Sequence, residues 1–301
     1  MTLDFHPDAR RPRLWCLVAE DNVLLDGLQH LKRKVLRQAS RLPGVRLLWP
    51  KPPVVSLVTR VLLGVGAKPM YTFGVYWAAS LAKLLGIAGI SVIEFGVAGG
   101  QGLLALENSA EEVEQHFGVA IDVFGFDTGR GMPAPTDYRD LPYVWGKGFY
   151  TMDVERLQAR LKKARLILGD VEETLPAFLP EVKHSIGFVS FDLDYYSSTK
   201  KAFRVWDGSP ATRLPRVICY FDDIFWPMRA YHNEYLGELC AIREYNLDHS
   251  EMKLCPIHML RHTQARPSAW HDQMYVLHDF HHPLYCVNTT PPDARFRQLS
   301  L

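Results

Sequence analysis

The feature that most constrains this chain is a regular alternation of two kinds of segment, which begins at Ile90. Short apolar runs of strand length, rich in Val, Ile, Leu or Phe, occur at Ile90–Phe95, Ile121–Phe126, Leu166–Leu168, Ile186–Phe191 and Val217–Phe221. Helix-length amphipathic stretches occur at Gln101–His116, Val154–Ala164, Glu172–Phe178, Ser198–Trp206 and Ala230–Tyr245. This alternation predicts right-handed βαβ units and a doubly wound parallel sheet covered by helices on both faces.

Two later apolar runs, Met252–Met259 and Gln273–Phe280, are separated only by a loop. They predict an antiparallel hairpin that closes one edge of the sheet. The residues before the alternation differ from it, with helices expected at Val54–Val65 and Tyr71–Leu85 and a basic helix at Leu28–Leu42. We therefore expect an N-terminal helical extension over residues 1–85 and an α/β domain over residues 86–301.

Charge and cysteine content exclude several classes of protein. The formal net charge is +1, so no strong overall field attracts nucleic acid. The five cysteines are scattered without a CxxC pair, which argues against a disulfide framework and a structural zinc site. The longest run without Asp, Glu, Lys or Arg spans 14 residues, Pro69–Ala82, too short for a membrane span of about 20. We expect a cytoplasmic protein; whether Leu28–Leu42 is a solvated face or binds a membrane surface or acidic partner stays open.

Polar residues follow the predicted parallel strands, where ligands of open α/β sheets bind. The first strand ends in a glycine turn, Glu94 to Gly102, in which Ala98 replaces the second glycine of the dinucleotide fingerprint. Asp127 follows the second strand at the place where an acid commonly binds a ribose diol, or it begins a turn. Asp170 follows the third strand and either caps the next helix or meets the edge of an adenine ring.

Four carboxylates follow the fourth and fifth strands. Asp192 and Asp194 would lie on one side of an extended chain, and Asp222 and Asp223 follow the neighbouring strand. Unpaired, such carboxylates repel one another and raise one another's pKa values, which a divalent cation would relieve. Mg²⁺ suits these hard oxygen ligands best, and Mn²⁺ is possible. The alternative is structural, with Asp222 or Asp223 as a helix cap and Asp192 paired to an arginine.

The strings EFGVAGG, GFDTGRGMP, LGDVEETLP, FDLDYYSSTKKAF and CYFDDI occur in this order from Glu94 to Ile224. In these motifs the chain resembles the macrocin-type O-methyltransferases, which use S-adenosylmethionine to methylate sugar hydroxyls in macrolide and aminocoumarin biosynthesis. The resemblance implies the class I methyltransferase fold, with seven strands of which the last is antiparallel.

The resemblance also implies a role for each motif residue. For the cofactor, it assigns the methionine end to Glu94, Gly96 and Gly99, the ribose to Asp127, and the adenine side to Asp170. For the metal, it suggests Mg²⁺ ligands at Asp192, Asp222 and Asp223. It suggests Asp194 as the general base. Relatives are often oligomers, so a homo-oligomer is possible.

Two further regions have open interpretations. His232 and His258 are alternative bases in the acceptor pocket, whereas the tract His278 to His282 matches no zinc spacing and fits a solvated strand end. The loop Gly129–Thr151 contains Tyr138, Tyr143, Trp145 and Tyr150, and forms either a lid or a segment packed on the domain surface.

The leading hypothesis is therefore a metal-assisted O-methyltransferase whose acceptor is a small molecule, a sugar or a glycosylated metabolite. The alternatives are a non-catalytic protein that binds S-adenosylmethionine and a nicotinamide-dependent oxidoreductase on a related sheet. The intact acidic cluster disfavours the first alternative, and Ala98 disfavours the second.

Overall fold

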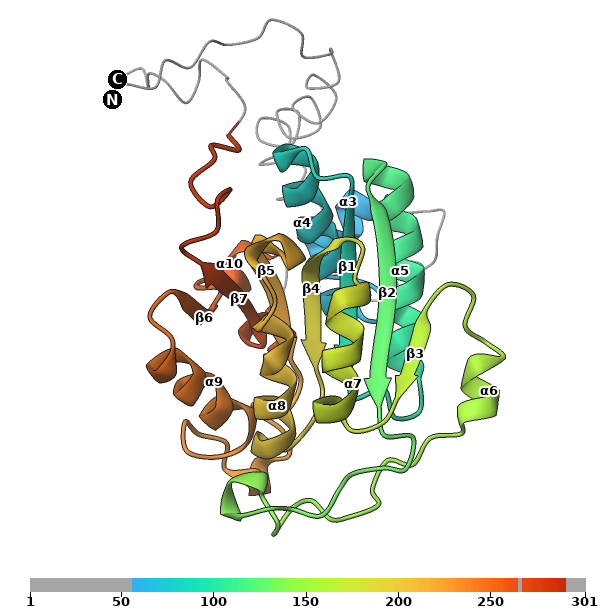
Figure 1. The fold of residues 1–301 in the computed structure, drawn as a ribbon, viewed down its shortest axis with the longest axis vertical. Helices are drawn as coiled ribbons and strands as arrows, with labels where there is room; N and C mark the ends of the chain where they lie inside the picture. The colour runs from blue at the N-terminus through green and yellow to red at the C-terminus, as the bar shows by residue number, and fades with distance from the viewer. Residues whose placement is uncertain (1–55, 265–266, 291–301) are drawn as a thin grey trace, which may run out of the picture. The chain divides into compact units, whose positions relative to one another are not determined.

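A single seven-stranded sheet sets the frame of the protein (Figure 1). The computed structural model describes residues 56–264 and 267–290. The strands are β1 (Gly89–Phe95), β2 (Ala120–Asp127), β3 (Arg165–Leu168), β4 (Ser185–Phe191), β5 (Arg213–Phe221), β6 (Met252–Pro256) and β7 (Met274–Asp279). They lie in the order β3-β2-β1-β4-β5-β7-β6.

Strands β1 to β5 pair in parallel, and β7 runs antiparallel to both of its neighbours, β5 and β6. This is the strand order of the class I methyltransferase fold, so the predicted fold class and the predicted edge hairpin are confirmed. The hairpin loop contains a short helix, α10 (Leu260–Thr263).

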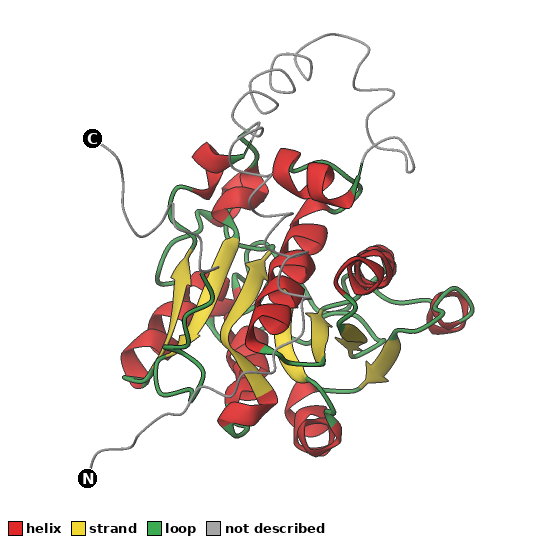
Figure 2. Ribbon diagram, turned by 90° about the horizontal axis from the view of Figure 1, so that it is seen from above, coloured by secondary structure: helices red, strands yellow, loops and turns green. Residues whose placement is uncertain are grey.

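Helices cover both faces of the sheet. They are α3 (Leu57–Leu63), α4 (Pro69–Leu85), α5 (Gln101–Phe117), α6 (Val154–Gln158), α7 (Val171–Phe178), α8 (Tyr196–Ala202) and α9 (Gly237–Asp248). Helices α4 and α5 pack against one face, whereas α7, α8 and α9 follow one another across the other face, which is turned toward the viewer in Figure 1. The view in Figure 2, turned by 90°, shows helices on both sides of the sheet.

Aromatic side chains of β4 show how both faces are filled. Phe188 packs edge-on against Tyr71 of α4, with ring centroids 5.9 Å apart. Phe191 faces the other side, where it packs against Phe203 just after α8 at 5.2 Å. Successive side chains of a strand point to opposite faces, so residues three apart are divided between the two layers. The central strand is therefore buried on both sides, as its continuous apolar sequence predicts.

Two predicted helices are shorter than their sequence pattern indicates. The stretch Val154–Ala164 is helical only as far as Gln158. The buried Glu107 carboxylate accepts hydrogen bonds from the backbone N–H groups of residues 162, 163 and 164, which holds that segment in a loop before β3. The stretch Ala230–Tyr245 becomes helical only at Gly237, because a short turn ends at Tyr231 in the left-handed conformation, with φ +50°.

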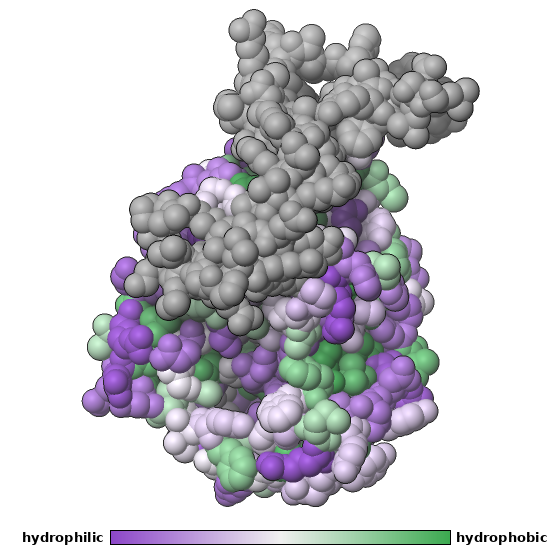
Figure 3. Space-filling model, turned by 180° about the vertical axis from the view of Figure 1, so that it is seen from behind, coloured by the Kyte–Doolittle hydropathy of each residue, from purple (hydrophilic) through white to green (hydrophobic). Residues whose placement is uncertain are grey.

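Helix α4 belongs to the core of the sheet domain, because its buried residues pack against β1, β4 and β5. The domain boundary expected at residue 86 stays a prediction. The helix expected at Leu28–Leu42 lies outside the described residues. Among the described residues, no helix is both long enough and apolar enough to cross a membrane. The face opposite that of Figure 1 carries hydrophobic residues in patches among hydrophilic ones (Figure 3).

Candidate functional site

The strand order reverses between β1 and β4, and this is the place where open α/β sheets bind ligands. Strands β1 and β4 separate only after Phe95, whose carbonyl accepts a hydrogen bond of 2.9 Å from the Asp192 backbone N–H. Gly96 then turns away with φ +85°, and a Cβ at this position would lie 1.8 Å from the Asp192 carbonyl oxygen. Only glycine fits where the backbone approaches the Asp192 carbonyl this closely, which explains why the motif has a glycine at position 96.

A cavity of about 690 Å³ opens at the carboxyl ends of the parallel strands, within the range of small-molecule sites. Most of the predicted site residues line it: Gly96, Asp127, Asp170, Asp192, Asp194, Asp222 and Asp223. Glu94 and Gly99 are not among its lining residues. The topology thus brings the ends of all five parallel strands to one cavity.

Asp127 fastens the glycine turn at the cavity wall. One carboxylate oxygen accepts hydrogen bonds of 2.9 Å from the backbone N–H groups of Val97 and Ala98. The other oxygen accepts a bond of 2.7 Å from the N–H of Gly129. The carboxylate therefore shapes the turn directly, and the role in ribose binding stays a prediction.

Asp170 caps α7, as one of its two predicted interpretations requires. Its side chain accepts a hydrogen bond of 2.8 Å from the backbone N–H of Glu172. It also forms an ion pair of 3.2 Å with Lys201, which among the described residues is the only lysine or arginine that lines this cavity. Contact with an adenine ring stays a prediction.

Glu94 is buried below the turn and contacts a residue that the sequence analysis missed. The hydroxyl of Tyr71, from α4, donates a hydrogen bond of 2.5 Å to one carboxylate oxygen. The other oxygen has no hydrogen-bond partner in the described part of the chain. Burial raises the pKa of Glu94 to about 8, although the bond from Tyr71 opposes this shift. The predicted contact with the methionine end of a cofactor stays a prediction.

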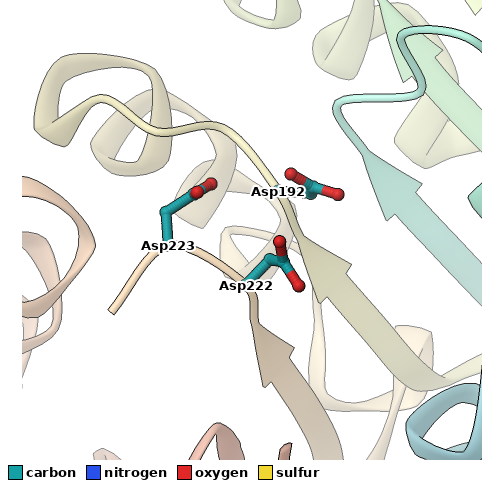
Figure 4. Close-up of side chains that lie close together, drawn as sticks. All are labelled: Asp192, Asp222 and Asp223. Carbon is teal, nitrogen blue, oxygen red and sulfur yellow. The ribbon is translucent and has the colours of Figure 1, made fainter. Parts of the chain in front are cut away.

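Asp192, Asp222 and Asp223 form a cluster of three carboxylates, here called the aspartate triad. One oxygen from each lies within 4.8 Å of the others. Figure 4 shows the three side chains gathered at the ends of β4 and β5. Burial and mutual repulsion raise the pKa values of Asp192 and Asp223, in the direction that the sequence predicts.

The aspartate triad fits a hard divalent cation better than the structural alternative. Among the ion pairs of the described residues, none joins a triad carboxylate to a lysine or arginine. Lys68 acts on Asp192 only through its charge, which opposes the rise in pKa. Neither Asp222 nor Asp223 caps α9, which begins at Gly237. Three oxygen donors without a cationic partner suit Mg²⁺ or Mn²⁺.

Asp194 lies beside the aspartate triad in a tight turn. Its φ is +58°, and the Tyr195 N–H donates a hydrogen bond of 2.5 Å to the Leu193 carbonyl across it. The expectation that Asp192 and Asp194 share one side of an extended chain is therefore wrong, because β4 ends at Phe191 and the chain turns. A non-glycine residue with positive φ is strained and occurs often at functional sites.

The turn keeps Asp194 close to the triad. Its backbone N–H donates a hydrogen bond of 2.9 Å to a carboxylate oxygen of Asp223. Burial and the charge of Asp192 raise the pKa of Asp194 to about 7, although an interaction with the Asp223 side chain opposes the rise.

Three polar residues that the sequence analysis missed support the aspartate triad. The Tyr220 hydroxyl donates a hydrogen bond to the carboxylate of Asp222, and the Gln273 side-chain amide donates a hydrogen bond of 2.7 Å to the Asp222 carbonyl. Glu238, from α9, accepts hydrogen bonds from the backbone around the cluster. Strand alternation places Tyr220 on the same side as Asp222 and was an available signal. No local pattern points to Glu238 or Gln273.

The loop Gly129–Thr151 forms one wall of the cavity through Trp145 and Tyr150. Its buried Asp140 accepts hydrogen bonds of 2.8 and 2.9 Å from the backbone N–H and hydroxyl of Ser197, at the start of α8. Tyr143 donates a bond of 2.9 Å to the carbonyl of Ala230 in the loop after β5. The loop is thus both fastened to the domain and part of the cavity wall.

No histidine of the described residues lines the cavity. Neither His232 nor His258 is among its lining residues, so the structure gives no support to either as the base. In the C-terminal tract, His278 hydrogen-bonds to the Tyr285 hydroxyl at 2.8 Å, and His281 pairs with Glu251. His282 is buried and accepts a bond of 3.0 Å from the Leu284 N–H, so the tract is only partly a solvated strand end.

No family model matches the chain, and no curated protein matches it. A crystal structure of CalS11, a calicheamicin methyltransferase, is 18% identical over 93% of this chain and 100% of that chain, with a TM-score of 0.47. The apo structure of CalS11, described as a TDP-rhamnose 3′-O-methyltransferase of calicheamicin biosynthesis, is 22% identical over 83% and 92%, with a TM-score of 0.40.

The O-methyltransferase TomG from Streptomyces achromogenes, involved in tomaymycin synthesis and crystallised with S-adenosylmethionine, is 12% identical over 78% of this chain and 93% of that chain, with a TM-score of 0.38. Identities and TM-scores this low support no conclusion about chemistry. The fold assignment rests on the strand order of this chain.

Proposed function

We propose that this chain is an S-adenosylmethionine-dependent O-methyltransferase that uses Mg²⁺ or Mn²⁺ and acts on a hydroxyl of a small molecule. The observation that carries the proposal is the aspartate triad in the cavity that also contains Asp127 and Asp170. A metal site and a nucleoside-type site in one cavity match a reaction that needs both. The motifs from Glu94 to Ile224 favour a sugar or a glycosylated natural product as the acceptor.

The residues present fit both implied groups. The cavity of about 690 Å³ has room for a cofactor together with an acceptor of modest size. Asp192, Asp222 and Asp223 would hold the metal ion, Asp127 would bind the ribose, and Asp170 would lie on the adenine side. When bound, a divalent ion offsets the charge of the carboxylates and lowers the pKa of a nearby hydroxyl.

The protein's own part in the reaction is to align the acceptor and remove its proton. The turn holds Asp194 beside Asp223, and both residues line the cavity. We assign Asp194 the role of general base, which accepts the proton of the acceptor hydroxyl. Trp145 and Tyr150, with Phe225 and Trp226 from the loop after β5, offer aromatic surfaces that would hold the rest of the acceptor.

A binding experiment tests the cofactor assignment. Calorimetric titration with S-adenosylhomocysteine should give a saturable heat and a higher Tm, because a ligand that binds only the folded state stabilises it. NAD serves as the control ligand, since binding of NAD alone would indicate an oxidoreductase. No heat and no rise in Tm with S-adenosylhomocysteine would contradict the proposal. The cytoplasmic location and the homo-oligomer stay predictions.

A further inference from the structure

Glu238 is a buried carboxylate that contacts both loops of the aspartate triad. It is fully buried in the first turn of α9. One oxygen accepts a hydrogen bond of 3.1 Å from the backbone N–H of Asp223. The other accepts a longer bond of 3.4 Å from the N–H of Leu193, which lies between Asp192 and Asp194. A single side chain therefore joins the backbone after β4 to the backbone after β5.

The start of α9 is built to bring this side chain to the loops. Gly237 begins the helix with φ +55°, and a Cβ added there would lie 3.6 Å from the Asp194 carbonyl oxygen. Glycine adopts this left-handed conformation without strain, and the distance of 3.6 Å shows that the first turn of α9 lies against the Asp194 turn. Glu238 follows at the position where its carboxylate meets the two N–H groups.

The contacts of Glu238 differ from those of an ordinary buried ion pair. Among the ion pairs of residues 56–264 and 267–290, none includes Glu238. It is not among the residues that line the cavity either. Its two oxygens accept hydrogen bonds from backbone N–H groups. Glu238 therefore sets the distance between the loop after β4 and the loop after β5.

We propose that Glu238 is a positioning residue for the divalent metal ion: by accepting N–H groups from both loops, it holds Asp192 and Asp223 at the separation that a cation requires. This inference rests on the metal role in the proposed function. Residues that orient metal ligands from behind typically change metal affinity or activity 10–100-fold when replaced.

The chain contains a matched control for a merely structural role. Glu107 is also buried, at 5% exposure, and also accepts hydrogen bonds from loop backbone N–H groups. Its partners, at residues 162 to 164, precede β3 and carry none of the proposed metal ligands. A buried carboxylate that only stabilises a loop should behave like Glu107.

The experiment compares Glu238→Gln with Glu107→Gln in the full-length protein. Glutamine has one carbonyl oxygen where two N–H groups need acceptors, so Glu238→Gln forces its amide NH₂ against one of them. Calorimetric titration with MnCl₂ alone should show about 10–100-fold weaker binding for Glu238→Gln. Binding by Glu107→Gln should equal that of wild type, and circular dichroism should show both variants folded.

Glu238→Asp and the rescue of kcat by excess metal provide two further measurements. If Glu238→Gln does not fold, Glu238→Asp retains the charge on a shorter side chain and should weaken Mn²⁺ binding as well. In a folded variant, excess metal should restore kcat, because Glu238 acts only through the ligands.

Wild-type affinity in a folded Glu238 variant would overturn the inference, as would equal losses in the Glu107 control. If the wild type itself binds no Mn²⁺, the metal part of the proposed function fails together with this inference. If the wild type binds Mn²⁺ and only the Glu238 result fails, the proposed function stands.

Discussion

Glu244 in α9 and Asp194 at the cavity are carboxylates whose surroundings shift their pKa values in opposite directions. Glu244 accepts hydrogen bonds from the Lys200 ammonium at 2.8 Å and the Tyr196 hydroxyl at 2.5 Å, and it pairs with Arg139 at 3.1 Å. These contacts lower the pKa of Glu244 to about 2. Burial raises the pKa of Asp194 to about 7, and the neighbouring Asp192 adds to the rise.

The difference shows in which region the chain supplies its own positive charges to balance the carboxylates. The network around Glu244 contains its own lysine and arginine, so its charges are balanced by the fold. The aspartate triad receives hydrogen bonds from the Tyr220 hydroxyl and the Asp194 backbone N–H, but no ion pair from a lysine or arginine among the described residues. Buried carboxylates in such surroundings need an external cation or protons.

Asp194→Asn distinguishes the role of a general base from the role of a metal ligand. It should lower kcat by about 10²–10⁴-fold, the usual contribution of a general base, with little change in S-adenosylhomocysteine affinity. Steady-state kinetics and calorimetry measure the two quantities. The control is Asp192→Asn, whose loss of activity excess Mg²⁺ should partly restore. Near-wild-type kcat in Asp194→Asn, with no rescue of Asp192→Asn, would mean that the two roles are reversed.

Metal should stabilise the cavity region and leave the Glu244 network unaffected. At about one hundred times its Kd, Mg²⁺ should raise the free energy of unfolding by about 2.7 kcal/mol. Asp222→Asn should remove most of this gain, whereas Glu244→Gln should keep it. Urea unfolding with and without Mg²⁺ gives the measurement. EDTA should abolish methyl transfer, and full activity in metal-free buffer would remove the metal from the mechanism.

Asp127 represents a third arrangement, in which backbone N–H groups satisfy a carboxylate. Asp127→Ala should weaken S-adenosylhomocysteine binding by about 1–3 kcal/mol, because it strands the N–H groups of the glycine turn and removes the expected ribose acceptor. Calorimetry measures the loss, and Asp127→Asn is the milder comparison. An unchanged affinity in the alanine variant would contradict the ribose assignment.

Glu244→Gln tests the self-contained network through pH. The folded pKa of Glu244 is about 2, below its ordinary value of 4.5, so its ion pairs stabilise the protein above that value and lose their effect as pH falls toward 2. At neutral pH the variant should lose about 1–2 kcal/mol of unfolding free energy, reduced by partial solvent exposure. The difference from wild type should shrink between about pH 5 and pH 2. A difference independent of pH would contradict the ion-pair explanation.

Parts of the site could be predicted because they follow from local pattern and sheet topology. Asp192 and Asp222 come directly after buried strands, Asp223 follows Asp222, and parallel strands end at the same edge of a sheet. Their proximity therefore follows once the strands are recognised. The cap at Asp170 is likewise a property of a few consecutive residues.

Other parts depend on contacts between distant segments. Tyr71 reaches Glu94 from α4, and Glu107 ends α6 early by binding N–H groups 55 to 57 residues away. The turn at Asp194 overrides strand alternation because the chain beyond β4 is held by Asp223 and Glu238. No periodicity or motif encodes these pairings.

By itself, the sequence determined the order of strands and helices, the fold class, and the carboxylates that meet at the ends of β4 and β5. These features depend on side-chain periodicity and chain connectivity, which a sequence contains directly. Only the tertiary structure decided the backbone turn at Asp194, the two hydrogen bonds by which Glu238 joins the loops after β4 and β5, and the balance of charge around each carboxylate. Burial and hydrogen bonding set these properties, and both depend on which distant residues the packed fold brings together.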